Sequence, residues 1–167
     1  MDEKYSLEKF VPLIKMYAAV IVLTIAKQFL FVGHDHLVTH THDWMNDFMG
    51  IMFLMAGTFK VMDLCCFADA FEKYDLVARL CRPYALGYPF IELGLGVAYM
   101  FRWQLLLVNW TVLALMLVSS AGVAHALWNK VDAKCGCMGI MAEMPVTFVT
   151  LLEDLLMAAM AVMMLYM

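Results

Sequence analysis

The sequence predicts an all-α integral membrane protein, a four-helix transmembrane bundle preceded by one further N-terminal transmembrane helix. Hydrophobic residues make up 65% of the 167 residues and charged residues only 16%, whereas soluble domains are roughly half apolar and a quarter charged. The apolar residues gather in long stretches, as bilayer-crossing helices require. This composition excludes a soluble globular protein and a disordered chain. The net charge of −4 excludes a nucleic-acid binder, because no basic field attracts phosphates.

Five apolar stretches predict the membrane spans. They cover residues 11–32, 47–62, 84–101, 104–128 and 145–166. Only Arg102 and Trp103 separate the third stretch from the fourth, so we expect these two helices to form a tight antiparallel hairpin. Neither a repeat nor a low-complexity linker interrupts the chain. We therefore expect one membrane domain over residues 1–167, with an extra first span (11–32), a His-rich loop (33–46) and a four-helix core (47–166).

The basic residues predict the orientation of the spans, because short cytoplasmic loops are enriched in Lys and Arg. With the N-terminus in the cytoplasm, the inner side holds nine of the eleven Lys and Arg residues, and the outer side only Lys27 and Arg102. We therefore expect a multi-pass protein with a cytoplasmic N-terminus. This orientation places all five cysteines on the cytoplasmic side and the His-rich loop outside.

Paired cysteines are the most specific local signal. Cys135 and Cys137 are separated only by Gly136, and such a pair can close a small, strained disulfide ring that is readily reduced. The same two thiolates could instead bind a soft metal ion. Cys65 and Cys66 are adjacent, which favours metal capture or exchange with another thiol over a bond to each other. Buried cysteine is also an ordinary small hydrophobe.

Charged residues within the apolar stretches predict a polar site inside the bundle. Lys60 and Asp63 are three residues apart and would share a helical face. Glu92 lies within the third span, where a charge must face the bundle interior and a partner, for which Lys60 is the natural candidate. A structural ion pair and a site that binds a polar ligand or relays protons both fit. Glu153 and Asp154 lie near the middle of the fifth span, and two adjacent acids cannot share one helix face.

The loop between the first two spans is rich in histidine. His34, His36, His40 and His42 all occupy even positions, so an extended segment would direct them to one face. Imidazoles with nearby carboxylates suit Zn²⁺, Cu²⁺ or Ni²⁺. A solvated polar loop explains the same composition. The predicted orientation separates this loop from the thiols by the whole membrane.

These residues stand in an order that resembles the MauE/DoxX family of redox-associated bacterial membrane proteins, from about residue 47 to residue 167. The motifs that carry the resemblance are Gly57-x-x-Lys60-x-x-Asp63, then Phe67, Phe71 and Tyr74, then Pro89-x-x-Glu92-x-Gly94, and then Cys135-Gly136-Cys137-Met138-Gly139. Met138 replaces the phenylalanine usual in MauE-like proteins, and Glu153-Asp154 replaces a basic–polar pair. The first span, the His-rich loop and Cys65-Cys66 have no counterpart in the pattern.

The resemblance implies a four-helix bundle in the bacterial inner membrane that works with thioredoxin-like or glutaredoxin-like partners, or in quinone-linked redox systems. Our leading hypothesis is a membrane thiol–disulfide redox protein, in which Cys135 and Cys137 exchange electrons and Cys65 or Cys66 resolves the mixed disulfide. One alternative is a transporter or binding protein for a soft or heavy metal ion, mercury or copper, bound by Cys65, Cys66, Cys135 and Cys137. Another is a non-catalytic subunit of a larger membrane complex or homo-oligomer. The cofactor stays open between none, a soft metal ion and a quinone.

Overall fold

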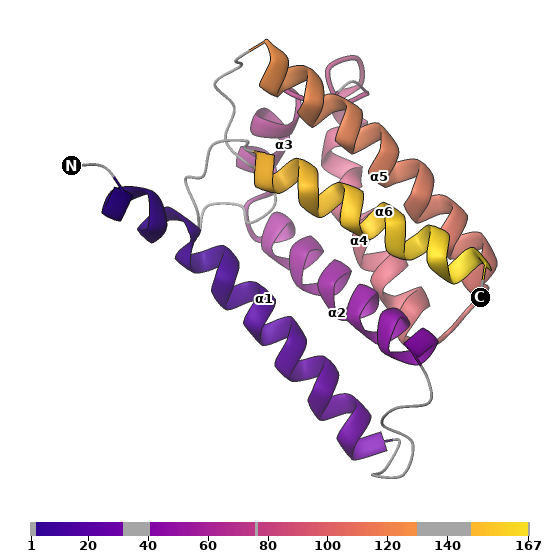
Figure 1. Ribbon diagram of the computed structural model, residues 1–167. Helices are drawn as coiled ribbons and strands as arrows, with labels where there is room; N and C mark the ends of the chain where they lie inside the picture. Colours follow the sequence, from indigo (N-terminus) through magenta and orange to yellow (C-terminus); the bar gives the residue numbers. More distant parts are fainter. Residues whose placement is uncertain (1–2, 32–40, 76, 130–147, 167) are drawn as a thin grey trace.

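The computed structural model describes residues 3–31, 41–75, 77–129 and 148–166, and every regular element in these ranges is a helix (Figure 1). The predicted all-α class is therefore confirmed for this part of the chain. The helices are α1 (Glu3–Phe31), α2 (Thr41–Met62), α3 (Leu64–Phe71), α4 (Arg82–Met100), α5 (Leu105–Trp128) and α6 (Phe148–Tyr166).

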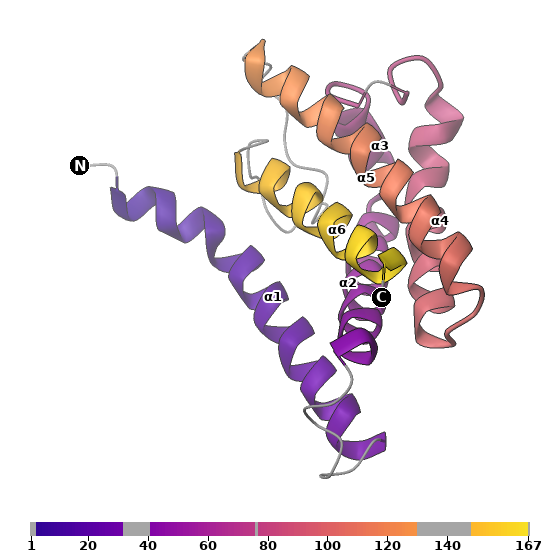
Figure 2. The same cartoon turned by 45° about the vertical axis from the view of Figure 1, so that its right-hand side comes forward.

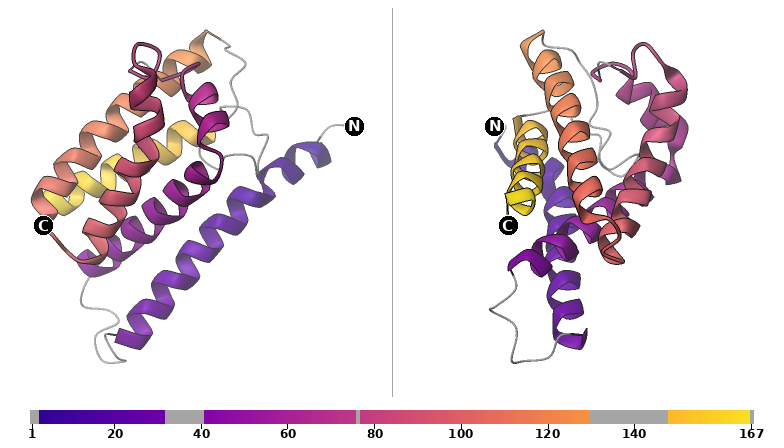
Figure 3. Two further views of the ribbon diagram at one scale, coloured as in Figure 1. Left: turned by 180° about the vertical axis from the view of Figure 1, so that it is seen from behind. Right: turned by 90° about the vertical axis from the view of Figure 1, so that its right-hand side faces the viewer.

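The long helices pack as two pairs, α2 against α4 and α5 against α6, which meet through α4–α5 and α2–α6 contacts. Helix α1 lies along α2 at the edge of this bundle, and α6 lies between α1 and α5 (Figure 2). The short α3 packs on the first part of α4, at one end of the bundle (Figure 3). The main core is built of apolar side chains such as Phe53, Tyr99, Val112 and Met116.

Among the described residues, α5 is the one helix that by itself is long and apolar enough to cross a bilayer. Helices α2 and α3 pass the same test together, as a broken span bent by 102°. The other predicted spans, 11–32, 84–101 and 145–166, overlap α1, α4 and α6. Helix α1 begins earlier than predicted, at Glu3, and residues 32 and 145–147 lie outside the described residues. The four-plus-one transmembrane arrangement therefore stays a prediction.

The start of α2 differs from the predicted boundary. The helix begins at Thr41, so residues 41–46 are helical rather than part of the expected loop of residues 33–46. Asp43 lies in the first turn, where a negative charge is stabilised by the helix dipole, and it pairs with Arg102 at 2.8 Å. Asp47, in the second turn, accepts a hydrogen bond from Gln28 at 2.7 Å and pairs with Lys27. These contacts hold α1 and the α4–α5 turn against the start of α2.

The break between α2 and α3 lies at Asp63. Its side chain caps α3 by accepting the N–H of Cys66 at 3.3 Å, which supplies a partner for a donor that the helix cannot satisfy. The expectation that Lys60 and Asp63 share a helical face is therefore wrong, because α2 ends at Met62 and the chain turns sharply before α3.

Helices α2 and α4 approach closely because glycines face each other across their interface. A Cβ atom added to Gly96 would lie 3.0 Å from the carbonyl oxygen of Gly50 and 2.8 Å from Cγ of Leu54. One added to Gly57 would lie 3.1 Å from the carbonyl oxygen of Pro89. Small residues at a helix interface let backbones come together in this way. The close approach determines how far Lys60 of α2 stands from Glu92 of α4.

Candidate functional site

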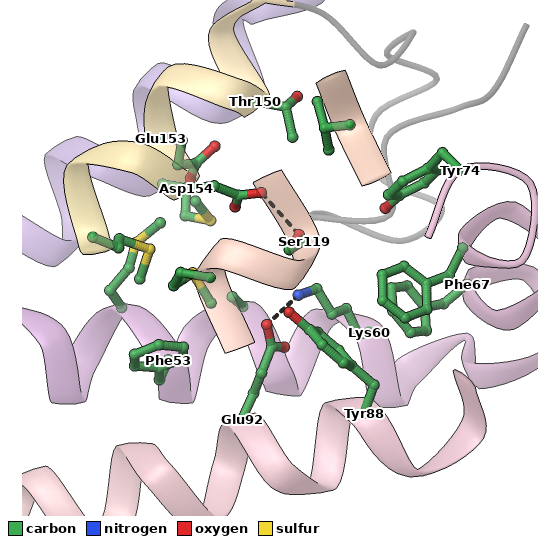
Figure 4. A pocket seen from close by; sticks show the side chains of 17 residues that line it. Phe53, Lys60, Phe67, Tyr74, Tyr88, Glu92, Ser119, Thr150, Glu153 and Asp154 are labelled. Carbon is green, nitrogen blue, oxygen red and sulfur yellow. Dashed lines mark hydrogen bonds and ion pairs between the residues drawn. The ribbon is translucent and has the colours of Figure 1, made fainter. Parts of the chain in front are cut away.

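A polar cavity lies inside the bundle, where side chains from all six helices and the turn after α3 meet (Figure 4). Its volume is about 40 Å³, which is room for roughly three waters. Its polar lining consists of Lys60, Tyr74, Tyr88, Glu92, Ser119, Thr150, Glu153 and Asp154. The remaining lining is apolar and rich in methionine and phenylalanine: Met16, Met52, Phe53, Ala56, Phe67, Phe71, Met116, Val123 and Met157.

Lys60 and Glu92 form an ion pair across the α2–α4 interface, and their side chains are only 8% and 4% exposed. The ammonium of Lys60 also lies 5.1 Å from the ring centre of Tyr88 and 5.5 Å from that of Phe67, within the range of cation–π attraction. Glu92 uses Oε1 for the ion pair, while its Oε2 is buried and has no hydrogen-bond partner among the described residues. Figure 4 shows this carboxyl directed toward the cavity.

The two adjacent acids of α6 both line the cavity, and each is 9% exposed. Asp154 accepts a hydrogen bond from the hydroxyl of Ser119 on α5 at 2.8 Å. Glu153 is hydrogen-bonded by Tyr17 of α1. The expectation that adjacent acids cannot share a face is therefore too strict. Because α6 lies between α1 and α5, Glu153 contacts α1 and Asp154 contacts α5. Both acids nevertheless line the same cavity.

The described cysteines lie together at one end of the bundle. Cys65 and Cys66 occupy the first turn of α3, Cys81 precedes the first turn of α4, and all three are exposed free thiols. The end of α5 and the beginning of α6 lie at this same end (Figure 1). Cys135 and Cys137, which come between those two helices in sequence, lie outside the described residues.

The turn that leads to Cys81 is stabilised by a buried carboxyl. Asp75 accepts the N–H groups of Val77 at 2.9 Å and Ala78 at 2.8 Å. Burial raises the pKa of Asp75, and these two hydrogen bonds partly oppose the shift. These two hydrogen bonds stabilise the turn. The turn leads to Cys81 at the end of the bundle where α3 lies.

The side chains of the predicted histidine site lie outside the described part of the chain. His34, His36 and His40 lie outside the described residues, and His42 falls in the first turn of α2 with its side chain undescribed. Within the part of the chain that is described, no three His, Cys, Asp or Glu side chains are grouped to hold a metal ion. His125 is exposed at the end of α5, where it contacts Asn129.

The hydroxyl groups of the cavity were not predicted from the sequence. Tyr88 precedes Glu92 by one helical turn, a spacing that places both on one face of α4 and could have indicated that the tyrosine lines the same site. Ser119 carried a weaker signal, a small polar residue within the most apolar helix. Nothing local connects Tyr17 to Glu153, because α1 and α6 are distant in sequence.

The family described as methylamine utilisation protein MauE matches residues 38–167. The chain belongs to the MauE family. The resemblance to MauE is thereby confirmed, and the protein is a membrane protein of this family, while the link to DoxX stays a prediction. The match covers α2 to α6 and leaves α1 outside, so Met16 and Tyr17 are the parts of the site that the family match does not include. No curated protein and no solved structure matches the chain.

Proposed function

We propose that this MauE-family protein is a membrane thiol–disulfide redox protein that exchanges electrons with a thioredoxin-like or glutaredoxin-like partner. The observation that supports the proposal best is the group of exposed free thiols, Cys65, Cys66 and Cys81, at one end of the bundle. Exposed thiols are accessible to a soluble partner, whereas structural cysteines are usually buried. The described helix ends that precede and follow Cys135 and Cys137 in sequence, the end of α5 and the beginning of α6, lie at the same end.

The proposed exchange uses two thiols of this chain and one disulfide of the partner. The thiolate of Cys137 or Cys135 attacks a partner sulfur, forms a mixed disulfide and releases the other partner sulfur as a thiolate. A second thiol of this chain then attacks the mixed disulfide, forms an internal disulfide and frees the partner as a dithiol. Two electrons pass from this chain to the partner, and the reverse sequence returns them. Cys65 or Cys66 is our candidate for the resolving thiol.

The proposal also includes the orientation of the protein in the membrane. With the N-terminus in the cytoplasm of a bacterium and the protein in its inner membrane, the thiol end of the bundle faces the cytoplasm. The reactive partner would then be a cytoplasmic protein. The nine-to-two distribution of basic residues supports this orientation.

Soft-metal binding is the second candidate function, because the adjacent thiols of Cys65 and Cys66 are both exposed. Thiolates are preferred ligands of soft ions such as copper(I) or mercury(II). Cys135 and Cys137 would contribute further ligands. Purified protein that retains stoichiometric metal, and loses it in Cys65→Ser and Cys66→Ser variants, would favour this function over electron exchange.

Trapping the mixed disulfide tests the redox proposal. The triple variant Cys65→Ser/Cys66→Ser/Cys137→Ser keeps Cys135 but lacks Cys137 and both candidates for the resolving thiol, so we expect a covalent adduct between Cys135 and added oxidised thioredoxin or glutaredoxin that disappears on reduction. The matched control is Cys81→Ser, which removes one thiol but keeps both pairs and should not accumulate the adduct. Non-reducing electrophoresis of the detergent-solubilised protein measures the adduct. Five thiols that are inert to alkylation and to redox titration would contradict the proposal.

A further inference from the structure

The cavity holds more acidic than basic groups. Among the described residues that line it, Glu92, Glu153 and Asp154 carry carboxyl groups, and Lys60 carries the one ammonium. If all four were charged, the cavity would keep a net charge of −2, and an uncompensated buried charge costs several kcal/mol. One ammonium cannot balance three carboxylates, whichever of them it contacts.

The groups that surround Glu153 and Asp154 are compatible with protonated carboxyls at these two positions. The hydroxyl of Ser119 on α5 donates to Oδ2 of Asp154, and Tyr17 of α1 hydrogen-bonds Glu153. Lys60 of α2 and Glu92 of α4 supply one charge of each sign, which cancel. Among the described residues, the other titratable groups that line the space are the phenols of Tyr74 and Tyr88. The surroundings of Glu153 and Asp154 thus combine neutral hydroxyls with an already matched ion pair.

We propose that this cavity is a proton-binding site, in which Glu153 and Asp154 take up and release protons inside the bundle while Lys60 and Glu92 keep their opposite charges. A proton removes the excess negative charge without adding a cation next to the ammonium of Lys60, which would repel one. Ionisable groups inside membrane helices commonly serve proton transfer.

The unpartnered oxygen of Glu92 supports a path for these protons. Oε2 is buried, lies in the cavity wall and has no hydrogen-bond partner among the described residues, and the cavity has room for roughly three waters. Such waters would satisfy Oε2 and would connect it to the α6 acids, since a water donates and accepts at once. Met16 of α1 closes part of the same space, so α1 separates the acids from the lipid on its side. This inference is independent of the thiol chemistry.

Infrared spectroscopy of the purified protein tests the proposal, because protonated carboxyl groups absorb separately from carboxylates and shift in D₂O. We expect a protonated band at neutral pH that weakens in Asp154→Asn and in Glu153→Gln. Asp69→Asn is the matched control, because Asp69 is exposed and paired with Arg82, and it should leave the band unchanged. Asp75 is a buried carboxyl in the turn after α3, and Asp75→Asn shows how much it contributes to the same band.

The pH dependence of stability gives a second readout that does not rely on the infrared assignment. If the folded protein holds protons that the unfolded chain releases, stability falls as the pH rises. The neutral amide introduced by Asp154→Asn would mimic the protonated acid, so the stability of this variant should fall less steeply than that of the wild type. A wild type without a protonated band from Glu153 or Asp154, or one that is stabilised by sodium chloride but not by choline chloride, would overturn the proposal. The second result would assign the cavity to a metal cation.

Discussion

Lys60→Met is expected to destabilise the protein by about 3–5 kcal/mol, the cost of removing one partner from a buried ion pair. The reason is that the carboxyl of Glu92 is buried with Lys60 as its cationic partner on the neighbouring helix, and its second oxygen already lacks a hydrogen-bond partner among the described residues. Methionine is an unbranched apolar side chain one atom shorter than lysine, so the substitution removes the ammonium, with its charge and its hydrogen bond to Glu92, while keeping most of the apolar stem. The measurement is the free energy of unfolding in detergent.

The double variant Lys60→Met/Glu92→Leu separates loss of the pair from loss of packing. Replacing both members of a buried ion pair by apolar residues is often close to neutral, so we expect the double variant to be more stable than Lys60→Met alone. Arg82→Met is the surface control. Its partner Asp69 is 60% exposed, and such pairs contribute roughly 0–1 kcal/mol. A Lys60→Met protein as stable as the wild type would show that the pair does not hold the two helices.

Gly96→Ala is expected to cost about 1–3 kcal/mol, as overpacking of a well-packed interior does. The new Cβ atom would lie 2.8 Å from Cγ of Leu54 and 3.0 Å from the carbonyl oxygen of Gly50. A side chain can turn away, but the carbonyl belongs to the backbone of α2, so the two helices must move apart. That movement would also lengthen the Lys60–Glu92 ion pair. Thermal unfolding of the variant measures the cost.

Gly94→Ala is a matched control two residues away on the same helix. Nothing lies within 4 Å of a Cβ atom at Gly94, and alanine favours a helix over glycine by about 1 kcal/mol. We therefore expect Gly94→Ala to leave stability unchanged or to raise it slightly. Equal unfolding temperatures for the two alanine variants would argue against a close α2–α4 contact at Gly96.

The sequence predicted the features that follow from composition and from isolated charges. Long apolar stretches predicted the helices, because a bilayer or a core requires them. Glu92 is the one charged residue in an apolar stretch, and a charge buried inside a helix bundle requires a partner of opposite charge. Lys60 was the natural candidate among the few basic residues near the spans. The structure brings these two side chains together. The pairing follows from the burial of an isolated charge and does not depend on how the helices are arranged.

Features that depend on the arrangement of helices could not be predicted. The bend at Asp63 arises from a cap on α3 that competes with continuation of α2, and the apolar sequence around it carries no proline or glycine to indicate a break. Glu153 and Asp154 border one cavity because α6 lies between two other helices, which is a tertiary effect. The contribution of Tyr17 likewise depends on where α1 packs.

The proposed function depends on reactive thiols at the cytoplasmic end of a membrane bundle. Labelling of cysteines with a membrane-impermeant maleimide, in sealed vesicles of both orientations, tests this most directly. We expect Cys65 and Cys66 to react only from the cytoplasmic face. The one that resolves the mixed disulfide should become protected after incubation with an oxidised thioredoxin and should regain reactivity after reduction. Labelling from the outer face, or labelling that oxidation leaves unchanged, would contradict the proposed function.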